Sequence, residues 1–150
     1  MANDASITLE ATVLPDKIAK VISGSMTLAP ADVNHKWYHK LTSVTNSSND
    51  LIGGHYLSYT ALADSTAPET VNASDTVAFL LIKNHDTNDR SIYLNIANGT
   101  AAAATGNIYI GAGETWYARL TTTTVAHIHA ISSASTVECT VIALFDDTSA

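Results

Sequence analysis

Short apolar runs separated by polar turn residues fill the second half of the chain. From Thr76 to Phe145 they read TVAFLLIKN, IYLNIA, NIYI, TWYARL, VAHIHAIS and TVECTVIALF, and Gly, Asn, Asp, Ser and Thr lie between them. Several runs alternate apolar and polar residues, which is typical of half-buried strands, and Ile92, Leu94 and Ile96 form an inward row. Residues 77–82 are apolar throughout and predict a strand that is buried on both faces. We therefore expect six strands in this block.

The first half of the chain carries weaker strand signals. Residues 6–12 alternate in part and predict a strand. Residues 17–28 fit either a short helix or a strand, and their β-branched residues with Gly24 favour a strand with a bulge. Residues 35–45 predict a strand whose face with Lys36, Tyr38 and Lys40 is solvated. A short strand is expected at 55–60, and 61–75 predicts a long loop.

Turn residues recur about every eight to twelve positions, and no long helical pattern appears. This spacing predicts an all-β protein with one antiparallel β-sandwich, jelly-roll-like in layout. We expect residues 1–14 to be an N-terminal arm or edge strand and residues 15–145 to form the sandwich domain. Residues 146–150 are expected to be a flexible acidic tail.

Composition and charge exclude several classes of function. Charged residues make up only 14% of the 150 residues, which suits strand surfaces better than helix surfaces. The net charge of -7, with seven Lys and Arg in total, argues against nucleic-acid binding. No segment resembles a signal peptide or a membrane span, so we expect a soluble protein that is made in the cytoplasm. Cys139 excludes an internal disulfide, and its apolar run predicts a buried small hydrophobe.

His127 and His129 are the most suggestive candidates for metal ligands. Two histidines at i and i+2 on a strand share one face, as in cupin-type barrels. The cupin pattern also needs a glycine six residues before the first histidine and a glutamate four or five residues after the second. Thr121, Ser133 and Ala134 occupy those positions. A structural role is therefore favoured over a metal site.

The remaining motifs have ordinary structural explanations. His35 and His39 are four residues apart, about 13 Å along a strand, which is too far for one metal. One turn is rich in side-chain oxygens, from Asn84, Asp86, Asn88 and Asp89. These residues could form a calcium site or make local hydrogen bonds to the backbone, and we favour the hydrogen bonds. No nucleophile elbow, phosphate loop or dinucleotide fingerprint exists. We expect a protein that is not an enzyme and has no catalytic residues, no cofactor and no metal.

The segments FLLIKNHDTND, SIYLNI, IYIGAGETWYARL and VAHIHAIS with TVECTVIALF have a familiar order of strands and turns. This order resembles small virion structural proteins of tailed bacteriophages, particularly head decoration (cement) proteins and related tail or head-fibre components. The resemblance covers roughly residues 76–145 and, more loosely, TVLPDKIAKVISGSM and KWYHKLTSV. It implies a non-enzymatic protein on the capsid surface that binds the major capsid protein, often as a trimer, and holds capsomers together. It implies no nucleic-acid or membrane partner.

Under this hypothesis we expect the N-terminal segment and one strand to make the contacts, and the interface candidates are Ile7, Leu9, Val13, Trp37, Tyr38 and Leu41. An alternative function is a carbohydrate- or receptor-binding module of a virion tail or head fibre, with contacts from Trp37, Tyr38, Tyr56 and Tyr59. A third is a cupin-like metal enzyme centred on the two histidines discussed above.

Overall fold

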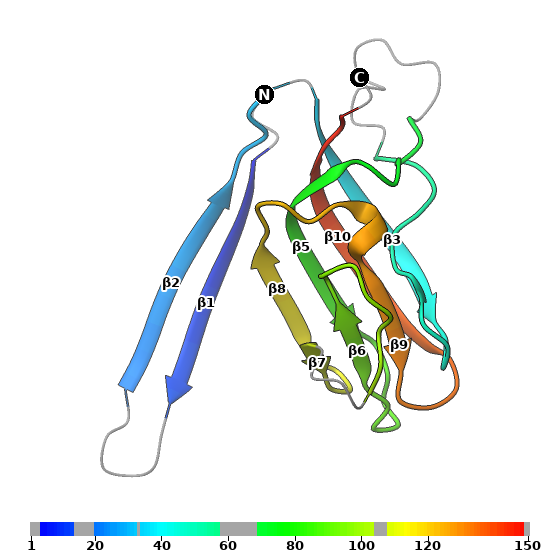
Figure 1. The fold of residues 1–150 in the computed structure, drawn as a ribbon. Helices are drawn as coiled ribbons and strands as arrows, with labels where there is room; N and C mark the ends of the chain where they lie inside the picture. Colours follow the sequence, from blue (N-terminus) through cyan, green and yellow to red (C-terminus); the bar gives the residue numbers. More distant parts are fainter. Residues whose placement is uncertain (1–3, 14–19, 33, 58–68, 104–107, 149–150) are drawn as a thin grey trace. The chain divides into compact units, whose positions relative to one another are not determined.

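A computed structural model of the chain describes residues 4–13, 20–32, 34–57, 69–103 and 108–148. These residues form antiparallel sheets that do not close into a barrel, and no α-helix occurs among them (Figure 1). The predicted all-β class is confirmed. The chain divides into two compact units, residues 1–33 and 34–150. This boundary lies later than residue 14, where the sequence pattern placed it.

The first unit contains two strands, β1 (Ala5–Val13) and β2 (Lys20–Leu28), which pair only with each other. Their antiparallel register runs from Ala5 opposite Leu28 to Val13 opposite Lys20 without a shift. The predicted bulge at Gly24 is therefore wrong, because Gly24 pairs directly with Leu9. We call this two-stranded element the ribbon.

The second unit contains two four-stranded sheets. The first has the order β3-β10-β5-β8, formed by His35–Val44, Val137–Asp146, Thr76–Asn84 and Thr115–Arg119. The second has the order β4-β9-β6-β7, formed by Asn49–Asp50, His129–Ser132, Ile92–Asn95 and Ile108–Ile110. We call these sheet 1 and sheet 2. All neighbouring strands are antiparallel.

Both sheets contribute to one hydrophobic core. Its fully buried members include Leu80, Ile82, Val141 and Phe145 from sheet 1, and Ile92, Leu94, Ile110 and Ala130 from sheet 2. The rings of Tyr38 and Tyr56 meet the Phe145 ring at 5.7 and 5.3 Å between centroids, in edge-to-face arrangements. Tyr38 also donates a hydrogen bond from its hydroxyl to the Gly53 carbonyl. The face of β3 that carries Tyr38 thus points inward, so the prediction that this face is solvated is wrong.

All six runs between Thr76 and Phe145 contribute a strand, as predicted, but one run is split. Residues 125–127 form a short 3-10 helix, η2 (Val125–His127), and β9 begins only at His129. The cause is a turn at residues 72–75, whose carbonyls bind this segment. Val125 N–H donates to the Asp75 carbonyl, and Ala126 N–H donates to the Ala73 carbonyl, both at 3.0 Å.

Two other segments differ from the predictions. The expected strand at 55–60 is reduced, in its described part, to an isolated bridge between His55 and Thr70, and residues 58–60 lie outside the described part. The acidic tail does not begin at residue 146. Asp146 ends β10, and the buried Asp147 donates its backbone N–H to the Asn34 carbonyl at 2.9 Å.

Asp75 is a buried carboxylate that ties three segments of the second unit together. It accepts hydrogen bonds from the Tyr56 hydroxyl, from Asn72 N–H at 2.6 Å and from Thr148 N–H at 3.3 Å. Burial and the contact with the Asp75 carboxylate both raise the pKa of Tyr56, so its hydroxyl stays a donor at every physiological pH. This network satisfies a carboxylate that is fully removed from solvent.

We expect Tyr56→Phe to lower the free energy of unfolding by about 1–3 kcal/mol, because it leaves a buried carboxylate without one of its donors. Urea denaturation followed by circular dichroism measures this loss. Tyr93→Phe is the matched control. It removes a hydroxyl from a half-buried ring on sheet 2 and should cost less than about 0.5 kcal/mol. Equal losses in the two variants would contradict the role given to Asp75.

Candidate interaction surface

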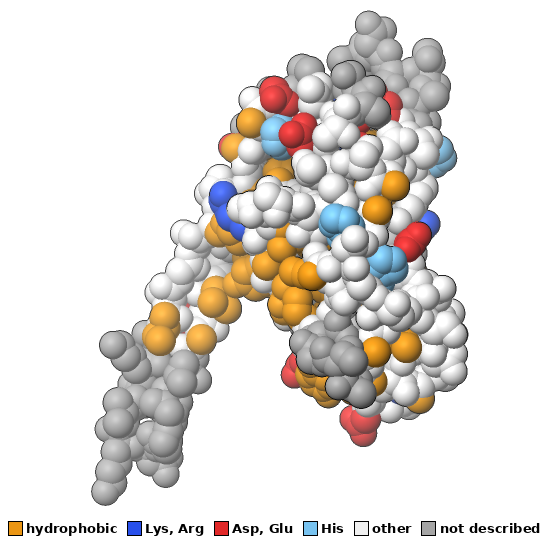
Figure 2. All heavy atoms as spheres, viewed as in Figure 1, with side chains coloured by type: hydrophobic (Ala, Val, Ile, Leu, Met, Phe, Trp, Pro, Cys, Tyr) orange, Lys and Arg blue, Asp and Glu red, His pale blue; other side chains and the backbone are white. Residues whose placement is uncertain are grey.

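The ribbon has one apolar face and one polar face. Residues directly opposite each other in an antiparallel pair point to the same side. One side therefore carries alternate residues of both strands, all of them apolar or glycine among the side chains that the structure describes: Ala5, Ile7, Leu9, Ala11, Ile22, Gly24, Met26 and Leu28. Figure 2 shows hydrophobic side chains along this ribbon. We call this side the ribbon's apolar face.

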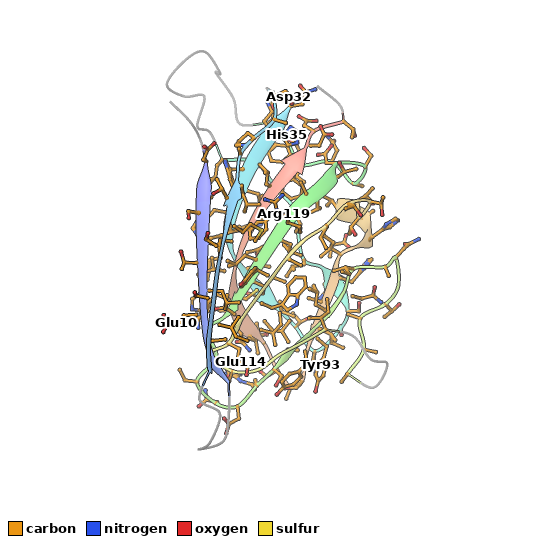
Figure 3. The ribbon with its side chains drawn as sticks, turned by 90° about the vertical axis from the view of Figure 1, so that its left-hand side faces the viewer. Glu10, Asp32, His35, Tyr93, Glu114 and Arg119 are labelled. Carbon is orange, nitrogen blue, oxygen red and sulfur yellow. The ribbon has the colours of Figure 1, made fainter. Side chains whose placement is uncertain are left out.

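The other side of the ribbon is polar throughout its described part: Ser6, Thr8, Glu10, Ser23, Ser25 and Thr27. Glu10 projects from β1 in Figure 3. A two-stranded hairpin cannot bury its own apolar face, and isolated hairpins are marginally stable in water. Leu9 and Ile22 are in fact 47% and 52% exposed. Leu28 at one end of this face is buried and Ile7 and Met26 are half-buried, so the exposed part of the face lies around Leu9 and Ile22.

Sheet 1 also carries apolar residues on the side away from the core, and three of them, Phe79, Leu144 and Trp37, are buried in the chain itself. On β10, Leu144 and Ile142 alternate with the core residues, so they point away from sheet 2. The register aligns Leu144 with Trp37 and Phe79, and Ile142 with Leu81. We call this side the outer face of sheet 1. Such a face is unusual because a sheet that packs on one side normally carries polar residues on the other.

Four of the six predicted interface residues lie on these two sides of the strands. Ile7 and Leu9 lie on the ribbon's apolar face. The backbone of Val13 pairs with Lys20, and its side chain lies outside the described part. Trp37 and the 58% exposed Leu41 lie on the outer face of sheet 1. Tyr38 is instead a core residue, with 1% of its surface exposed.

Sequence reasoning missed the second strand of the ribbon as part of this surface. The signal was present in residues 20–28, where Ile22, Met26 and Leu28 alternate with serine and threonine. Gly24 obscured it, because a glycine inside a strand suggests a bulge. The space around Gly24 does not demand a glycine, since a Cβ at this position would meet no other atom within 4 Å.

His127 and His129 do not share a strand face. His127 lies in η2, while His129 opens β9 and places its Nε2 3.1 Å from Oδ1 of Asp50. Within the described ranges, no three His, Cys, Asp or Glu side chains are grouped so that they could hold a metal ion. The pairing with Asp50 across the β4–β9 register is a structural role for His129.

The oxygen-rich turn at residues 84–89 is organised around Asp86. Its carboxylate accepts the N–H groups of Asn88 at 2.7 Å and Arg90 at 2.9 Å, and it pairs with the Arg90 guanidinium at 2.6 Å. Asn84 accepts the Asp86 N–H in turn. These are the local backbone hydrogen bonds that we favoured over a calcium site. Burial opposes ionisation of Asp86, but the donors from Arg90 and Asn88 outweigh it and lower the pKa of this carboxyl.

The aromatic residues proposed for glycan contact are mostly in the interior. Tyr38 and Tyr56 belong to the core, Trp37 is 8% exposed, and Tyr59 lies outside the described part. A different pair lies on sheet 2. Tyr109 is 57% exposed, and its ring packs edge-to-face on Tyr93 with 5.6 Å between centroids.

No protein-family model, curated protein or solved structure matches this chain. Among the described residues, no helix is long and apolar enough to cross a membrane. The surfaces described above are therefore the basis for a functional proposal.

We expect Asp86→Asn to remove part of the acid sensitivity of the fold. A carboxyl whose pKa is lowered on folding stabilises the folded state at pH values above its pKa in the unfolded chain, near 3.8. This stabilisation is lost as the pH falls through the lower pKa of the folded state. Unfolding free energy measured from pH 6 down to about pH 2 should fall less steeply in the variant than in the wild type. Asp89→Asn is the control, because Asp89 is exposed and asparagine tolerates its positive φ of 61°. An unchanged pH profile for Asp86→Asn would contradict this assignment.

Cys139 is buried in β10, as predicted, and burial raises the pKa of its thiol to about 12. We expect it to resist alkylation in the folded protein near neutral pH and to react once denaturant unfolds the chain. Mass spectrometry of iodoacetamide-treated samples makes the comparison. Stoichiometric modification of the folded protein within minutes would show that β10 is less protected than its burial indicates.

Proposed function

We propose that this chain is a non-enzymatic structural protein of a tailed-phage virion, of the head decoration (cement) type. In this role it binds the outer surface of the capsid and stabilises contacts between capsomers. The observation that carries the proposal is the ribbon. A hairpin of two nine-residue strands with one continuous apolar face requires a protein surface to cover it, and attachment to an assembly provides one.

The order of the strands supports this assignment. We propose that the two sheets form a jelly-roll sandwich, since consecutive strands leave one sheet for the other after β3, β4, β5, β7, β8 and β9. Jelly rolls occur in viral capsid proteins, lectins and cupins. This support is an analogy between folds. The ribbon is the feature on which we prefer a capsid protein to a lectin or a cupin.

Composition is consistent with an assembly protein. A chain with only 14% charged residues loses little charge solvation when its surface packs against another protein. The net charge of -7 favours solubility before assembly. The partner in this proposal is the major capsid protein, and the oligomer is a trimer on the capsid surface.

The presence of the chain on particles tests this proposal. Tailed-phage particles produced from the genome that encodes it should carry the chain in a fixed copy ratio to the major capsid protein, as measured by quantitative mass spectrometry. Particles that lack it should lose their DNA at a lower temperature, because the contacts between capsomers are weaker. Purified particles without the chain, or with trace amounts that vary between preparations, would overturn the proposal.

Carbohydrate binding on a virion fibre is the second candidate, favoured by Tyr109 and Tyr93 on sheet 2. Exposed tyrosine rings are common contacts for sugar rings because they offer a flat apolar surface with a polar edge. A glycan array should then give binding that is lost on Tyr109→Ala and kept on Trp37→Phe. An array without signal for the wild-type protein would remove this candidate.

A further inference from the structure

The turn that follows β6 contains the only Asn-Gly pair of the chain, Asn98 and Gly99. The side chain of Asn98 is exposed, and its φ of 55° lies in the left-handed region, which asparagine tolerates. The carboxamide carbon of an asparagine is an electrophile, and the main-chain nitrogen of the next residue can reach it by closing a five-membered ring. A glycine leaves that approach open because it has no Cβ.

We propose that Asn98 is a site of spontaneous deamidation, with the main-chain nitrogen of Gly99 as the nucleophile. The reaction uses only this chain and water. It is therefore independent of the proposed function and of any partner that the chain binds.

The first step forms a cyclic imide. Hydroxide removes the proton from the Gly99 nitrogen, and this nitrogen attacks Cγ of Asn98. A new C–N bond forms, the bond between Cγ and Nδ2 breaks, and Nδ2 takes up a proton from water and leaves as ammonia.

The second step is hydrolysis of the imide by water. Opening at Cγ gives an aspartate with the original main chain. Opening at the main-chain carbonyl gives an isoaspartate, in which the peptide continues through Cγ. The sum of the two steps consumes one water, releases one ammonia and adds one negative charge to the chain.

The nucleophile is accessible in the folded protein. Gly99 is partly exposed, and no residue in the described ranges accepts a hydrogen bond from its N–H. An amide that is already bonded must give up that bond before it can lose its proton. The N–H after the exposed Asn46 is in that position, because Ser47 donates it to Oγ1 of Thr45 at 3.4 Å.

The other exposed asparagines of the described ranges precede residues that have a Cβ. They are Asn46, Asn49 and Asn88, followed by Ser47, Asp50 and Asp89. A Cβ on the attacking residue crowds the forming ring, so each of these asparagines should react more slowly than Asn98.

Both ends of the turn are fixed. At its start, Oδ1 of Asn95 accepts the Ala97 N–H at 2.8 Å, and Nδ2 of Asn95 lies 3.5 Å from the Thr100 carbonyl. At its end, Ala101 is 1% exposed and donates its N–H to Oγ of Ser48 at 3.0 Å. Any change in the length of the main chain must therefore be absorbed between residues 98 and 100.

The two products should differ in their effect on the fold. Isoaspartate adds a methylene group to the main chain beside Gly99, where space is limited, since a Cβ on Gly99 would lie 2.9 Å from Nδ2 of Asn95. The added atom should displace the Asn95 side chain and weaken the turn. The aspartate product keeps the main chain unchanged and tolerates the positive φ of this position.

The test uses the full-length chain, incubated at physiological temperature in buffers from mildly acidic to mildly alkaline. Samples taken over several days are digested at mildly acidic pH, so that digestion causes no deamidation, and are mapped by mass spectrometry. We expect the peptide with Asn98 to gain the mass that converts an amide to an acid and to separate into two products. The rate should rise in proportion to hydroxide concentration, and ion exchange should show a growing acidic form of the intact chain.

Two variants locate the reaction. Asn98→Gly removes the carboxamide and tolerates the positive φ, so it should abolish the acidic form. Asn88→Gly is the matched control, because it removes another exposed asparagine, and the acidic form should appear at the wild-type rate. Circular dichroism verifies that both variants are folded. Among the separated wild-type products, the isoaspartate form should unfold at a lower urea concentration than the aspartate form.

Three results would overturn the inference. These are an unmodified Asn98 after days in alkaline buffer, faster modification of Asn46, Asn49 or Asn88, and an acidic form that persists in Asn98→Gly. A rate that does not depend on hydroxide would also overturn it, because the Gly99 nitrogen would then not be the nucleophile. The presence or absence of the chain on phage particles tests the proposed function alone and leaves this inference unchanged.

Discussion

The position of β10 between β3 and β5 is the constraint on which the second unit depends. One side of this strand carries Val141 and Phe145 into the core that both sheets share. The other side carries Ile142 and Leu144, which are as apolar as their inward neighbours. A central strand with two apolar sides forms its hydrogen bonds within one sheet but requires cover on both faces. Sheet 2 covers one face, and on the other face Leu144 is also buried while Ile142 is half-buried.

Polar groups in the interior are arranged around a few fully bonded residues rather than dispersed. Asp75 brings the segment around Tyr56, the turn at 72–75 and the end of the chain at Thr148 to one point. Asp86 holds a single turn together, because its carboxylate accepts the Arg90 N–H and pairs with the Arg90 guanidinium. In both cases a carboxylate accepts several N–H or O–H donors, which compensates for its removal from water. These residues have structural roles that their types alone would not reveal.

The strands could be predicted from the sequence because the period-two pattern is a local property. Runs such as 92–96 and 136–145 needed only their own residues to be recognised, and Ile92 and Leu94 are fully buried as expected. The orientation of β3 could not be predicted in the same way. Trp37 and Tyr38 are adjacent and both aromatic, and the flanking lysines made the Tyr38 side look solvated. Lys40 in fact directs its amine to the Gly53 carbonyl while Tyr38 fills the core.

Contacts between distant segments explain the remaining differences. The helix η2 exists because carbonyls at residues 73 and 75 accept its N–H groups, and no pattern within 125–132 contains that information. For the candidate surface, the sequence indicated Ile7, Leu9, Trp37 and Leu41 individually. It could not indicate that Ile22 and Met26 join Leu9 on one face, because that depends on the register of β1 against β2.

The unbroken register of the ribbon has a consequence for how this segment can vary. The register runs without a shift from the pair Ala5 and Leu28 to the pair Val13 and Lys20. Within each strand, the face of the ribbon on which a side chain lies therefore depends on whether its position is odd or even. Insertion or deletion of one residue in the middle of either strand would invert the side chains beyond it and interrupt the apolar face. Changes of two residues would preserve the alternation and alter only the length. Among descendants of this sequence, the ribbon should therefore tolerate length changes in steps of two, while point substitutions on its polar face remain free.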